Sequence, residues 1–97
     1  MINIAFHPGA DADYQDAFAW YEARSIQAAS NFEAAIEHAL RLIADDPNQW
    51  PFCDHIHRIY ILRRFPYSIV YRLDGDTVLV IAIAHARRRQ TYWKNRS

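Results

Sequence analysis

Apolar residues in the first half of the chain recur at the spacing of a helix. Between about residues 11 and 24 they fall at i, i+3, i+4 and i+7 and line one helical face: Tyr14, Ala17, Phe18 and Tyr21. A second stripe continues to about residue 44: Phe32, Ile36, Ala39, Leu40 and Ile43. Asp11 and Ser25 are suited to cap these two helices, and Pro47 ends the second. The pattern predicts a helical hairpin.

Elsewhere the apolar pattern has a period of two residues, which is typical of strands. "INIAFH" (2–7) predicts a short first strand, and "RIYILRR" (58–64) and "YSIVYRL" (67–73) predict later ones. Gly75 in "DGD" supplies the positive φ of a tight hairpin turn. The nearly unbroken apolar run "TVLVIAIA" (77–84) predicts a central strand buried on both faces. Alternation along this strand places His85 on one face with Leu79, Ile81 and Ile83.

The predicted order of elements is β–α–α–β–β–β, an α+β fold in a single domain that spans residues 1–97. We expect the helical hairpin to pack on one face of a small four-stranded, mostly antiparallel sheet. The other face of the sheet would then be open. The final segment, residues 85–97, loses periodicity and predicts either a short helix or an extended arm.

Composition adds to this picture mainly by exclusion. The chain is 52% hydrophobic and 14% aromatic, which is enough for a core and too much for a disordered segment. Cys53 is the only cysteine, so no internal disulfide can form. No apolar run approaches the ~18 residues that span a bilayer, and the N-terminus lacks the pattern of a signal peptide. We therefore expect a cytoplasmic protein.

The net charge of zero conceals an uneven distribution. Residues 1–50 hold two basic and eight acidic residues, a balance of −6, whereas residues 51–97 hold nine basic and three acidic ones, a balance of +6. Such a division indicates a nucleic-acid or acidic partner for the basic half. The alternative is that the two halves form ion pairs with each other across the fold.

Arginines stand at both ends of the most sheet-like stretch, "RRFPYSIVYRLDGDTVLVIAIAHARRR" (63–89). We expect cations to emerge on the uncovered face of the sheet, from Arg58, Arg72 and Arg87. Arg58 and Arg87 in particular would have to converge there. A face of this kind would bind a polyanion or an acidic protein segment.

The order of elements and the residues of the last strands resemble the RelE/ParE superfamily of toxins from bacterial type II toxin–antitoxin systems. The matching segments are "HPGADADYQDAFAWYEAR" (7–24) and, more specifically, "HRIYILRRFPYSIVYRLDGDTVLVIAIAHARRRQTYW" (57–93). The resemblance covers nearly the whole chain. It implies a toxin that a cognate antitoxin neutralises through a flexible, acidic or amphipathic segment, with a heterotetramer as one assembly.

Two activities occur in this superfamily. RelE-like members cleave messenger RNA on the ribosome with a cluster of basic residues, whereas ParE-like members poison DNA gyrase and have largely lost that cluster. Carried over residue by residue, Arg58 and Arg87 match basic positions of the RelE-like pattern. Tyr60 and Ser68 stand where a lysine and an arginine would be expected. The resemblance therefore favours the ParE-like, plasmid-stabilisation type.

Cleavage of RNA through its own 2′-hydroxyl needs a base, an acid and cations at the phosphate. Arg58 and Arg87 are the candidate cations, and His85 or Tyr92 is the candidate acid or base. The simpler interpretation of His85 is a strand-end residue that packs against the tail or caps a backbone group. Tyr92 or Trp93 also falls near an aromatic position of the resembled family.

Further cations and aromatics alternate around and within the tail, which suits phosphate contacts with base stacking, or carboxylate pairs with an antitoxin. The candidate target- or antitoxin-binding residues are Arg63, Arg72, Arg88, Arg89, Trp93 and Lys94. The alternative is a solvated tail whose Trp93 packs back on the helices. His55 and His57 near Cys53 form only a weak metal pattern. We expect neither a metal nor a cofactor.

The sequence thus predicts a ParE-like toxin that binds an essential target, most plainly DNA gyrase. Whether the chain is also an enzyme is left open, with the balance toward binding alone. The first alternative is a ribosome-dependent endoribonuclease. The second is a non-toxic homologue that only binds its antitoxin. None of the three involves a membrane.

Overall fold

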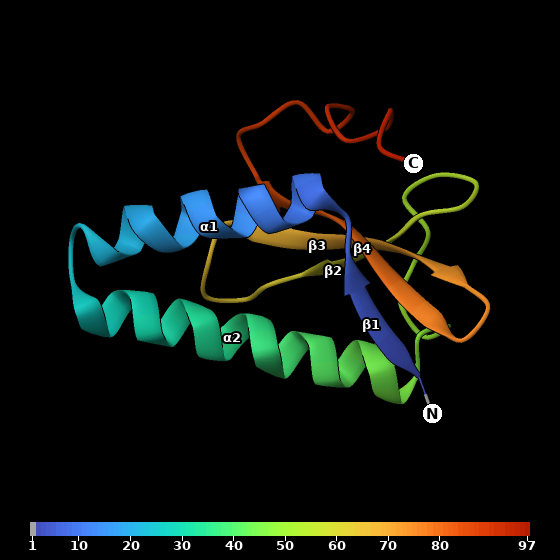
Figure 1. The fold of residues 1–97 in the computed structure, drawn as a ribbon, viewed down its shortest axis with the longest axis horizontal. Coiled ribbons are helices and arrows are strands. Elements are labelled where there is room, and N and C mark those ends of the chain that lie inside the picture. The colour runs from blue at the N-terminus through green and yellow to red at the C-terminus, as the bar shows by residue number, and fades with distance from the viewer. Residues whose placement is uncertain (1) are drawn as a thin grey trace.

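The computed structural model describes residues 2–97, which form two helices and four strands in the predicted order (Figure 1). The elements are β1 (Asn3–Phe6), α1 (Pro8–Glu22), α2 (Ile26–Asp45), β2 (Arg58–Ile61), β3 (Tyr67–Asp74) and β4 (Thr77–His85). The strands lie in the order β1-β4-β3-β2, with β1 parallel to β4 and the other pairs antiparallel. The α+β prediction with a mostly antiparallel sheet is confirmed.

The two helices end and begin where local chemistry favours it. Ser25 caps α2 as predicted, and its hydroxyl accepts a hydrogen bond from the Ala28 N–H at 3.2 Å. The predicted cap of α1 is wrong, because α1 begins at Pro8 and its cap is His7, whose Nδ1 accepts from the Gly9 N–H at 2.9 Å. Proline suits the first helical position, since the N–H that it lacks would have no partner there. No helix in residues 2–97 has the length and apolarity to cross a bilayer.

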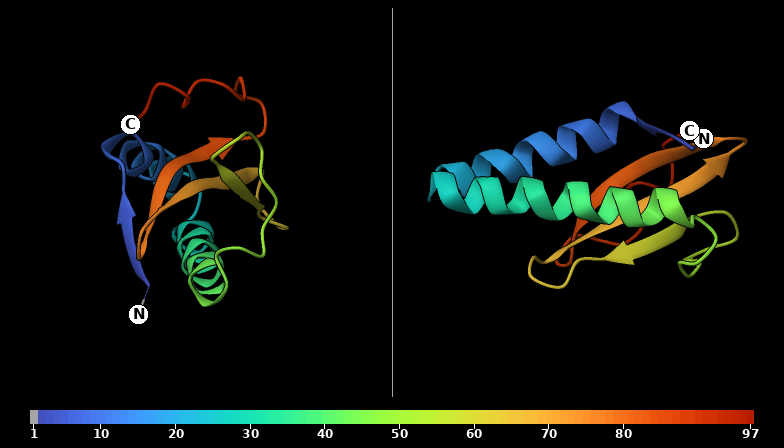
Figure 2. Two further views of the ribbon diagram at one scale, coloured as in Figure 1. Left: turned by 90° about the vertical axis from the view of Figure 1, so that its right-hand side faces the viewer. Right: turned by 90° about the horizontal axis from the view of Figure 1, so that it is seen from below.

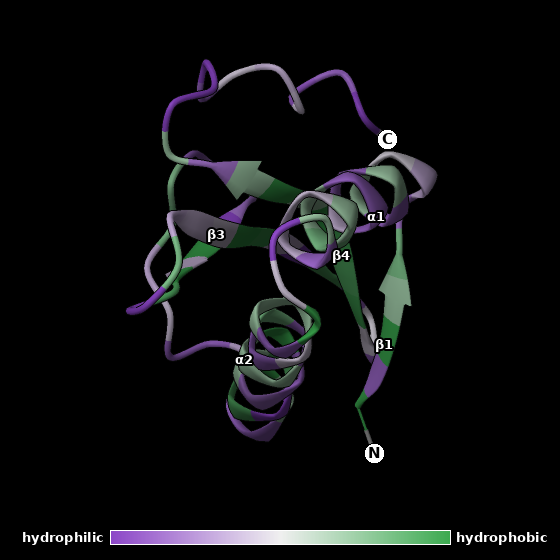
Figure 3. Cartoon of the chain, turned by 90° about the vertical axis from the view of Figure 1, so that its left-hand side faces the viewer, coloured by the Kyte–Doolittle hydropathy of each residue, from purple (hydrophilic) through white to green (hydrophobic). Residues whose placement is uncertain are grey.

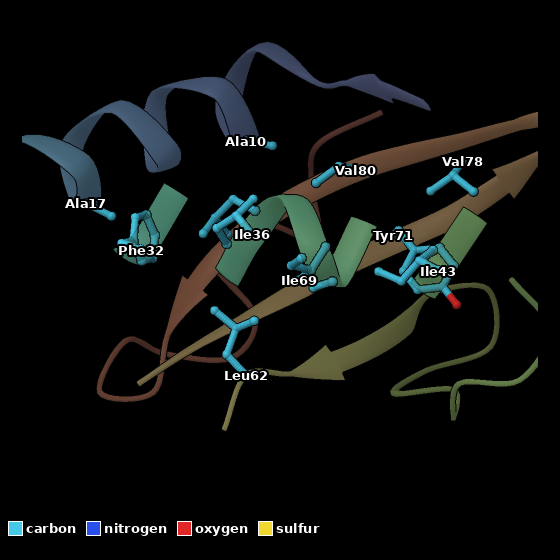
Figure 4. Close-up of a cluster of buried hydrophobic side chains, with 12 residues drawn as sticks. Ala10, Ala17, Phe32, Ile36, Ile43, Leu62, Ile69, Tyr71, Val78 and Val80 are labelled. Atoms are coloured by element: carbon cyan, nitrogen blue, oxygen red, sulfur yellow. The ribbon is translucent and has the colours of Figure 1, made fainter. Parts of the chain in front are cut away.

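The main core lies between the helical hairpin and one face of the sheet (Figure 4). It includes Phe32, Ile36 and Ile43 from α2, together with strand residues such as Ile69 and Val80, all of them buried. Figure 2 shows the two helices side by side along their lengths. The predicted stripe of α2 therefore forms the centre of the core.

The second face of the sheet is partly covered by the tail rather than open. Trp93 is 3% exposed and packs with Val70, Ile81, Ala82 and Ala84 in a second apolar cluster. Residues 86–97 contain turns and no helix, so the tail is neither the helix nor the free arm that the sequence predicts. Figure 3 shows this mostly hydrophilic tail beside the apolar strands.

A bulge interrupts the alternation of β4. Val70 pairs with Ala82 and Tyr71 with Val80, which leaves Ile81 as an extra residue opposite the β3 strand. Ile81 and Ala82 both belong to the cluster under the tail, whereas Ile83 belongs to the main core. The predicted grouping of Leu79, Ile81, Ile83 and His85 on one face is therefore wrong. The residues after the bulge lie on the face opposite to the one that simple alternation gives.

The chain that precedes β2 covers part of the outer edge of this strand. Phe52 forms an antiparallel bridge with Arg58, and the Ile59 N–H donates to the Pro51 carbonyl at 3.0 Å. The ring of Trp50 packs against Tyr60, with ring centroids 4.7 Å apart. Residues 50–53 thus act as a short additional strand beside the first part of β2.

Candidate functional site: an arginine-rich end of the sheet

The β3–β4 hairpin brings the two arginine groups of the sequence together at one end of the sheet. Tyr67 pairs with His85, and the Ala86 N–H donates to the Pro66 carbonyl at 2.8 Å. The loop before β3 and the segment after β4 therefore lie side by side. We call the resulting group the arginine end: Arg63, Arg64, Arg87, Arg88 and Arg89.

Most of this positive charge is directed to solvent. All five arginines of the arginine end are exposed. Of these five, only Arg88 forms an ion pair within residues 2–97, with Asp13 at 3.5 Å. The sequence predicted a cationic face of the sheet. The structure instead places the cations at the end of the sheet, beside the tip of the helical hairpin.

A cavity of about 450 Å³ lies between α1 and the arginine end, and we call it the α1 cavity. One face of α1 supplies Asp13, Asp16, Ala17 and Trp20, because these positions follow the i, i+3, i+4, i+7 spacing. The sheet and the segments beside it supply the opposite wall: Pro66, Tyr67, Ile83, His85, Arg87 and Arg88. Two of the predicted catalytic residues, His85 and Arg87, thus line the same cavity.

His85 is held in one orientation within this cavity. Its ring packs edge-on against Tyr67 at 4.9 Å between centroids, on the helix side of the sheet. Its Nδ1 accepts a hydrogen bond from the Arg87 N–H at 3.0 Å. In the neutral ring the proton is therefore assigned to Nε2, which remains a donor. The interpretation of His85 as a residue that caps a backbone group agrees with this geometry.

Tyr92 is joined to a buried carboxylate that the sequence did not single out. Its hydroxyl donates to Oδ2 of Asp13 at 3.0 Å. Burial of the phenol, followed by the effect of the Asp13 charge, raises the pKa of Tyr92 to about 12. The Arg88 guanidinium lies 3.6 Å from the centre of the Tyr92 ring. The Tyr92 hydroxyl is thus engaged in holding the tail.

Asp13 collects the remaining contacts that fix the tail. Arg96 donates to Oδ2 at 2.8 Å and to Oδ1 at 3.3 Å, and the Ile83 N–H donates to Oδ2 at 3.2 Å. The Asp13 side chain is only 6% exposed, and the side-chain hydrogen bond with it raises the pKa of Arg96. One signal was present in the sequence, since Asp13 lies four positions before Ala17 on the buried side of α1. The ion pairs of Asp13 with Arg88 and Arg96 join the acidic and basic halves of the chain.

The tail residues predicted to bind a partner divide into two groups. Trp93 is buried, and its ring also packs against His57 at 4.8 Å between centroids, so it has no surface to offer. Arg89 and Lys94 are exposed. Trp93 therefore packs back as that alternative predicts, but on the second face of the sheet and not on the helices.

Arg58 lies away from the arginine end, so the predicted convergence with Arg87 is wrong. Arg58 pairs with Tyr71 in the sheet, whereas His85 pairs with Tyr67 four residues along β3, which is about 13 Å at the usual rise per residue. The Arg58 guanidinium donates to the Trp50 carbonyl at 2.6 Å and lies over the Phe52 ring at 3.8 Å. Its register with Tyr71 also puts it on the helix side of the sheet.

Arg72 belongs to the same end of the sheet as the β3–β4 turn. It lies on the face that the tail partly covers, and its Nε is 3.5 Å from Oδ2 of Asp74. Gly75 in the turn adopts a φ of 58°, as the sequence predicted. Arg72 is thus separated from the arginine end by the length of the hairpin.

A second hollow of about 570 Å³ runs between α2 and β2, and we call it the α2 groove. Arg63 and Arg64 lie at its border. Its other walls are mostly apolar and are formed by Ala35, His38, Leu42, Trp50, Tyr60, Ile61, Leu62 and Phe65. A smaller hollow of about 410 Å³ extends it along α2 past Asn31. The arginine end therefore touches two depressions, one on each side of the hairpin.

The residues of the weak metal pattern have other contacts. The His57 Nδ1 lies 2.8 Å from Oδ2 of Asp54. Burial acts to raise the pKa of Asp54, but the N–H groups of His57 and Ile56 and the His57 ring together lower it to about 2. Burial, together with the charge of Asp54, raises the pKa of Cys53. Within residues 2–97 no group of three or more His, Cys, Asp or Glu side chains is placed to hold a metal ion.

Comparison with solved structures finds the same α+β fold in another protein. The chromosomal ParDE TA system from P. aeruginosa contains a chain that is similar to this one with a TM-score of 0.74. The sequence identity is 21%, and the match covers 88% of this chain and 96% of that one. At this identity the likeness establishes the fold alone, a small α+β domain.

The family is established by sequence. The family described as ParE toxin of type II toxin–antitoxin system, parDE, matches residues 4–90. This chain therefore belongs to the ParE toxin family, as the resemblance of its strands implied. No curated protein gives a significant match.

Proposed function

We propose that this ParE-family chain works in the cytoplasm as a toxin that binds and inhibits DNA gyrase, and that a cognate antitoxin neutralises it. The observation that favours it over a RelE-like enzyme is the separation of Arg58 from Arg87, which also means that a gyrase contact would have to use Arg87 and its neighbours without Arg58. A RelE-like enzyme needs several cations around one phosphate, because charge builds up there in the transition state. In this chain Arg58 contacts backbone carbonyls near the start of β2 instead.

The residues that remain near Arg87 also favour binding over catalysis. The Tyr92 hydroxyl is hydrogen-bonded to Asp13, and its raised pKa of about 12 makes it a weak acid near neutral pH. Asp13 and Asp16 line the same cavity and would oppose the negative charge of a scissile phosphate. A protein that acts by docking has no need of such a phosphate site.

The α2 groove is the surface that we assign to the antitoxin. Its apolar walls suit the hydrophobic side of an amphipathic segment, and the exposed Arg63 and Arg64 suit acidic residues of that segment. The groove and its extension run along α2 from Leu42 to Asn31 and together could receive one such segment. Arg87 and Arg88, which line the α1 cavity on the other side of the hairpin, would stay accessible beside such a partner.

The test is a parallel measurement of DNA supercoiling and translation. We expect the purified protein to inhibit supercoiling by purified gyrase and to leave a translating extract unaffected. Addition of the antitoxin encoded beside the gene should restore supercoiling, and Arg63→Glu combined with Arg64→Glu should weaken that rescue. Arrested translation with intact supercoiling would contradict the proposal.

The RelE-like alternative retains one favourable observation, which is that His85 and Arg87 line a single cavity. It predicts transcript cuts in a translating extract that disappear with Arg87→Ala in a protein that remains folded. If neither assay responds and expression without antitoxin does not slow growth, the chain is a non-toxic homologue that only binds an antitoxin.

A further inference from the structure

The α1 cavity combines features that the gyrase proposal does not use. It is bounded by aromatic rings on two sides, Trp20 and Tyr21 from α1 and Tyr67 from β3. Trp20 is 51% exposed although it is one of the largest apolar side chains. A volume of about 450 Å³ lies within the range of small-ligand sites. The Arg24 guanidinium covers one face of the Trp20 ring at 3.4 Å, and Tyr21 meets this ring edge-on, so a planar ligand would stack on the other face of Trp20.

The polar groups of the cavity form a mixed set of acceptors and donors. Asp16 is exposed and forms no ion pair within residues 2–97, so its carboxylate can accept two hydrogen bonds from a ligand. His85 offers an Nε2 donor, because its Nδ1 is occupied by the Arg87 N–H. Asp13 is already saturated by Tyr92, Arg96 and Ile83 and serves only as part of the wall.

The mouth of the cavity has the opposite charge. Arg87 and Arg88 line it and Arg89 follows them in the chain, whereas Arg63 and Arg64 line the α2 groove on the other side of the hairpin. Four of these five arginines form no ion pair within the described residues. Guanidinium groups bind phosphate oxygens through paired hydrogen bonds. The site therefore combines aromatic and carboxylate groups with the guanidinium groups of Arg87 and Arg88.

This arrangement discriminates between the two anionic partners that a cationic patch could take. An acidic peptide would meet the arginines favourably but would place its carboxylates beside Asp16. A nucleotide instead presents N–H donors on its base and negative charge on its phosphate. Guanine fits best, because its N1–H and exocyclic amine form two parallel donors for one carboxylate, and its O6 can accept from His85. Adenine offers only one such donor.

We propose that the α1 cavity and the arginine end bind single-stranded nucleic acid, with one guanine base in the cavity and the neighbouring phosphates on the arginines. The base stacks on the uncovered face of Trp20 and its donor edge binds Asp16. Binding of this kind requires no cleavage and does not depend on gyrase as the target. Since the whole chain has no net charge, the affinity rests on these arginines and falls steeply with salt.

The test uses the purified full chain and fluorescein-labelled pentamers of thymidine that carry dG, dA, dC or dT at the centre. Fluorescence anisotropy at low ionic strength should give the tightest binding for the dG pentamer, by at least about fivefold over dA. Asp16→Asn should remove this preference, whereas Asp11→Asn, an exposed aspartate elsewhere on α1, should retain it.

Two further variants separate stacking from phosphate contacts. Trp20→Ala should weaken all four pentamers by at least about fivefold, and Trp20→Phe should restore most of the affinity. Arg87→Ala should reduce the slope of log affinity against log salt by about 0.7, whereas Arg41→Ala on α2 should not change it. Circular dichroism of each variant verifies that it remains folded.

Equal affinity for the four pentamers, or a dG preference that survives Asp16→Asn, would overturn the proposal. So would the absence of any oligonucleotide binding, including the case in which a glutamate-rich peptide binds to the arginine end instead. Neither result bears on the supercoiling assay, so the gyrase proposal stands or falls separately.

Discussion

Asp13 offers the sharpest test of how the tail is held on the sheet. We predict that Asp13→Asn destabilises the whole domain, although the substitution changes the shape of the side chain very little. The carboxylate accepts from the Ile83 N–H, from the Tyr92 hydroxyl and from both terminal nitrogens of Arg96. The asparagine side chain is neutral, so it loses the ionic attraction to Arg96. Its NH2 group would also face N–H or O–H donors that now point at a carboxylate oxygen.

The expected cost follows from burial. Loss of one partner from a buried charged pair costs about 3–5 kcal/mol, and hydrogen bonds to charged groups contribute about 1.5–3 kcal/mol each. The Arg96 side chain is 18% exposed and can turn partly to water, which reduces the cost. We therefore expect a loss of about 2–4 kcal/mol in the free energy of unfolding. For a domain of this size, that corresponds to a decrease of at least about 8 °C in Tm.

Urea denaturation followed by circular dichroism measures this change, and amide exchange at Ile83 locates it. Asp16→Asn, one turn further along α1 and exposed, is the matched control and should remain within about 0.5 kcal/mol of the parent. A double-mutant cycle with Arg96→Gln should give a coupling of about 0.5–3 kcal/mol. If Asp13→Asn costs no more than the control and Ile83 exchanges at the parental rate, the tail is not held in this way.

Substitution of Gly9 tests the Asp13–Arg96 ion pair independently. A Cβ atom on Gly9 would clash with Nε of Arg96. Alanine normally stabilises a helix relative to glycine, but here we expect Gly9→Ala to push the Arg96 guanidinium from Asp13 and to lower stability. In an Arg96→Ala background the same substitution should become neutral or stabilising, which urea denaturation of the two pairs can decide.

The remaining predictions concern the tail tryptophan and three titrating groups. Trp93→Ala should cost about 3–5 kcal/mol in urea denaturation, because the indole is 3% exposed over the second cluster; a cost below 1 kcal/mol would mean that the tail is not packed there. Burial is the first cause that raises the pKa of Tyr71 and of Tyr92 to about 12, so phenolate absorbance should show two late tyrosines, and stability should fall as pH rises from about 10 through 12. The pKa of Asp54 is lowered from 3.8 to about 2, so the stability that it contributes should persist above pH 4 and disappear as pH falls toward 2, a loss that Asp54→Asn should not show.

The helices and strands could be predicted because their apolar periods are regular. The i, i+3, i+4 stripe of α2 became the core, and the continuous run of β4 became a strand buried on both faces. The pairing of side chains in β2 was also available, since Arg58 and Tyr60 alternate with Ile59. The sequence could not show which of the two faces the helices cover.

The site was harder to predict, because it depends on contacts between distant segments. A bulge at Ile81 places His85 on the opposite face from the one that alternation predicts, and no residue type in β4 indicates this bulge. Arg58 found its partners in carbonyls of residues 48 and 50, which become available only when that loop folds beside β2. The gathering of arginines at one end could have been foreseen, since any hairpin brings its two outer ends together.

The short strand formed by residues 50–53 has a consequence for how a partner can attach. An open edge strand is a template for another chain, because its free N–H and C=O groups invite main-chain pairing. The outer edge of the first part of β2 is already paired with Pro51 and Phe52 of the same molecule. A peptide that lies between α2 and β2 can therefore use only the last residues of β2, Tyr60 and Ile61, for main-chain pairing, so its side chains must supply the rest of its recognition.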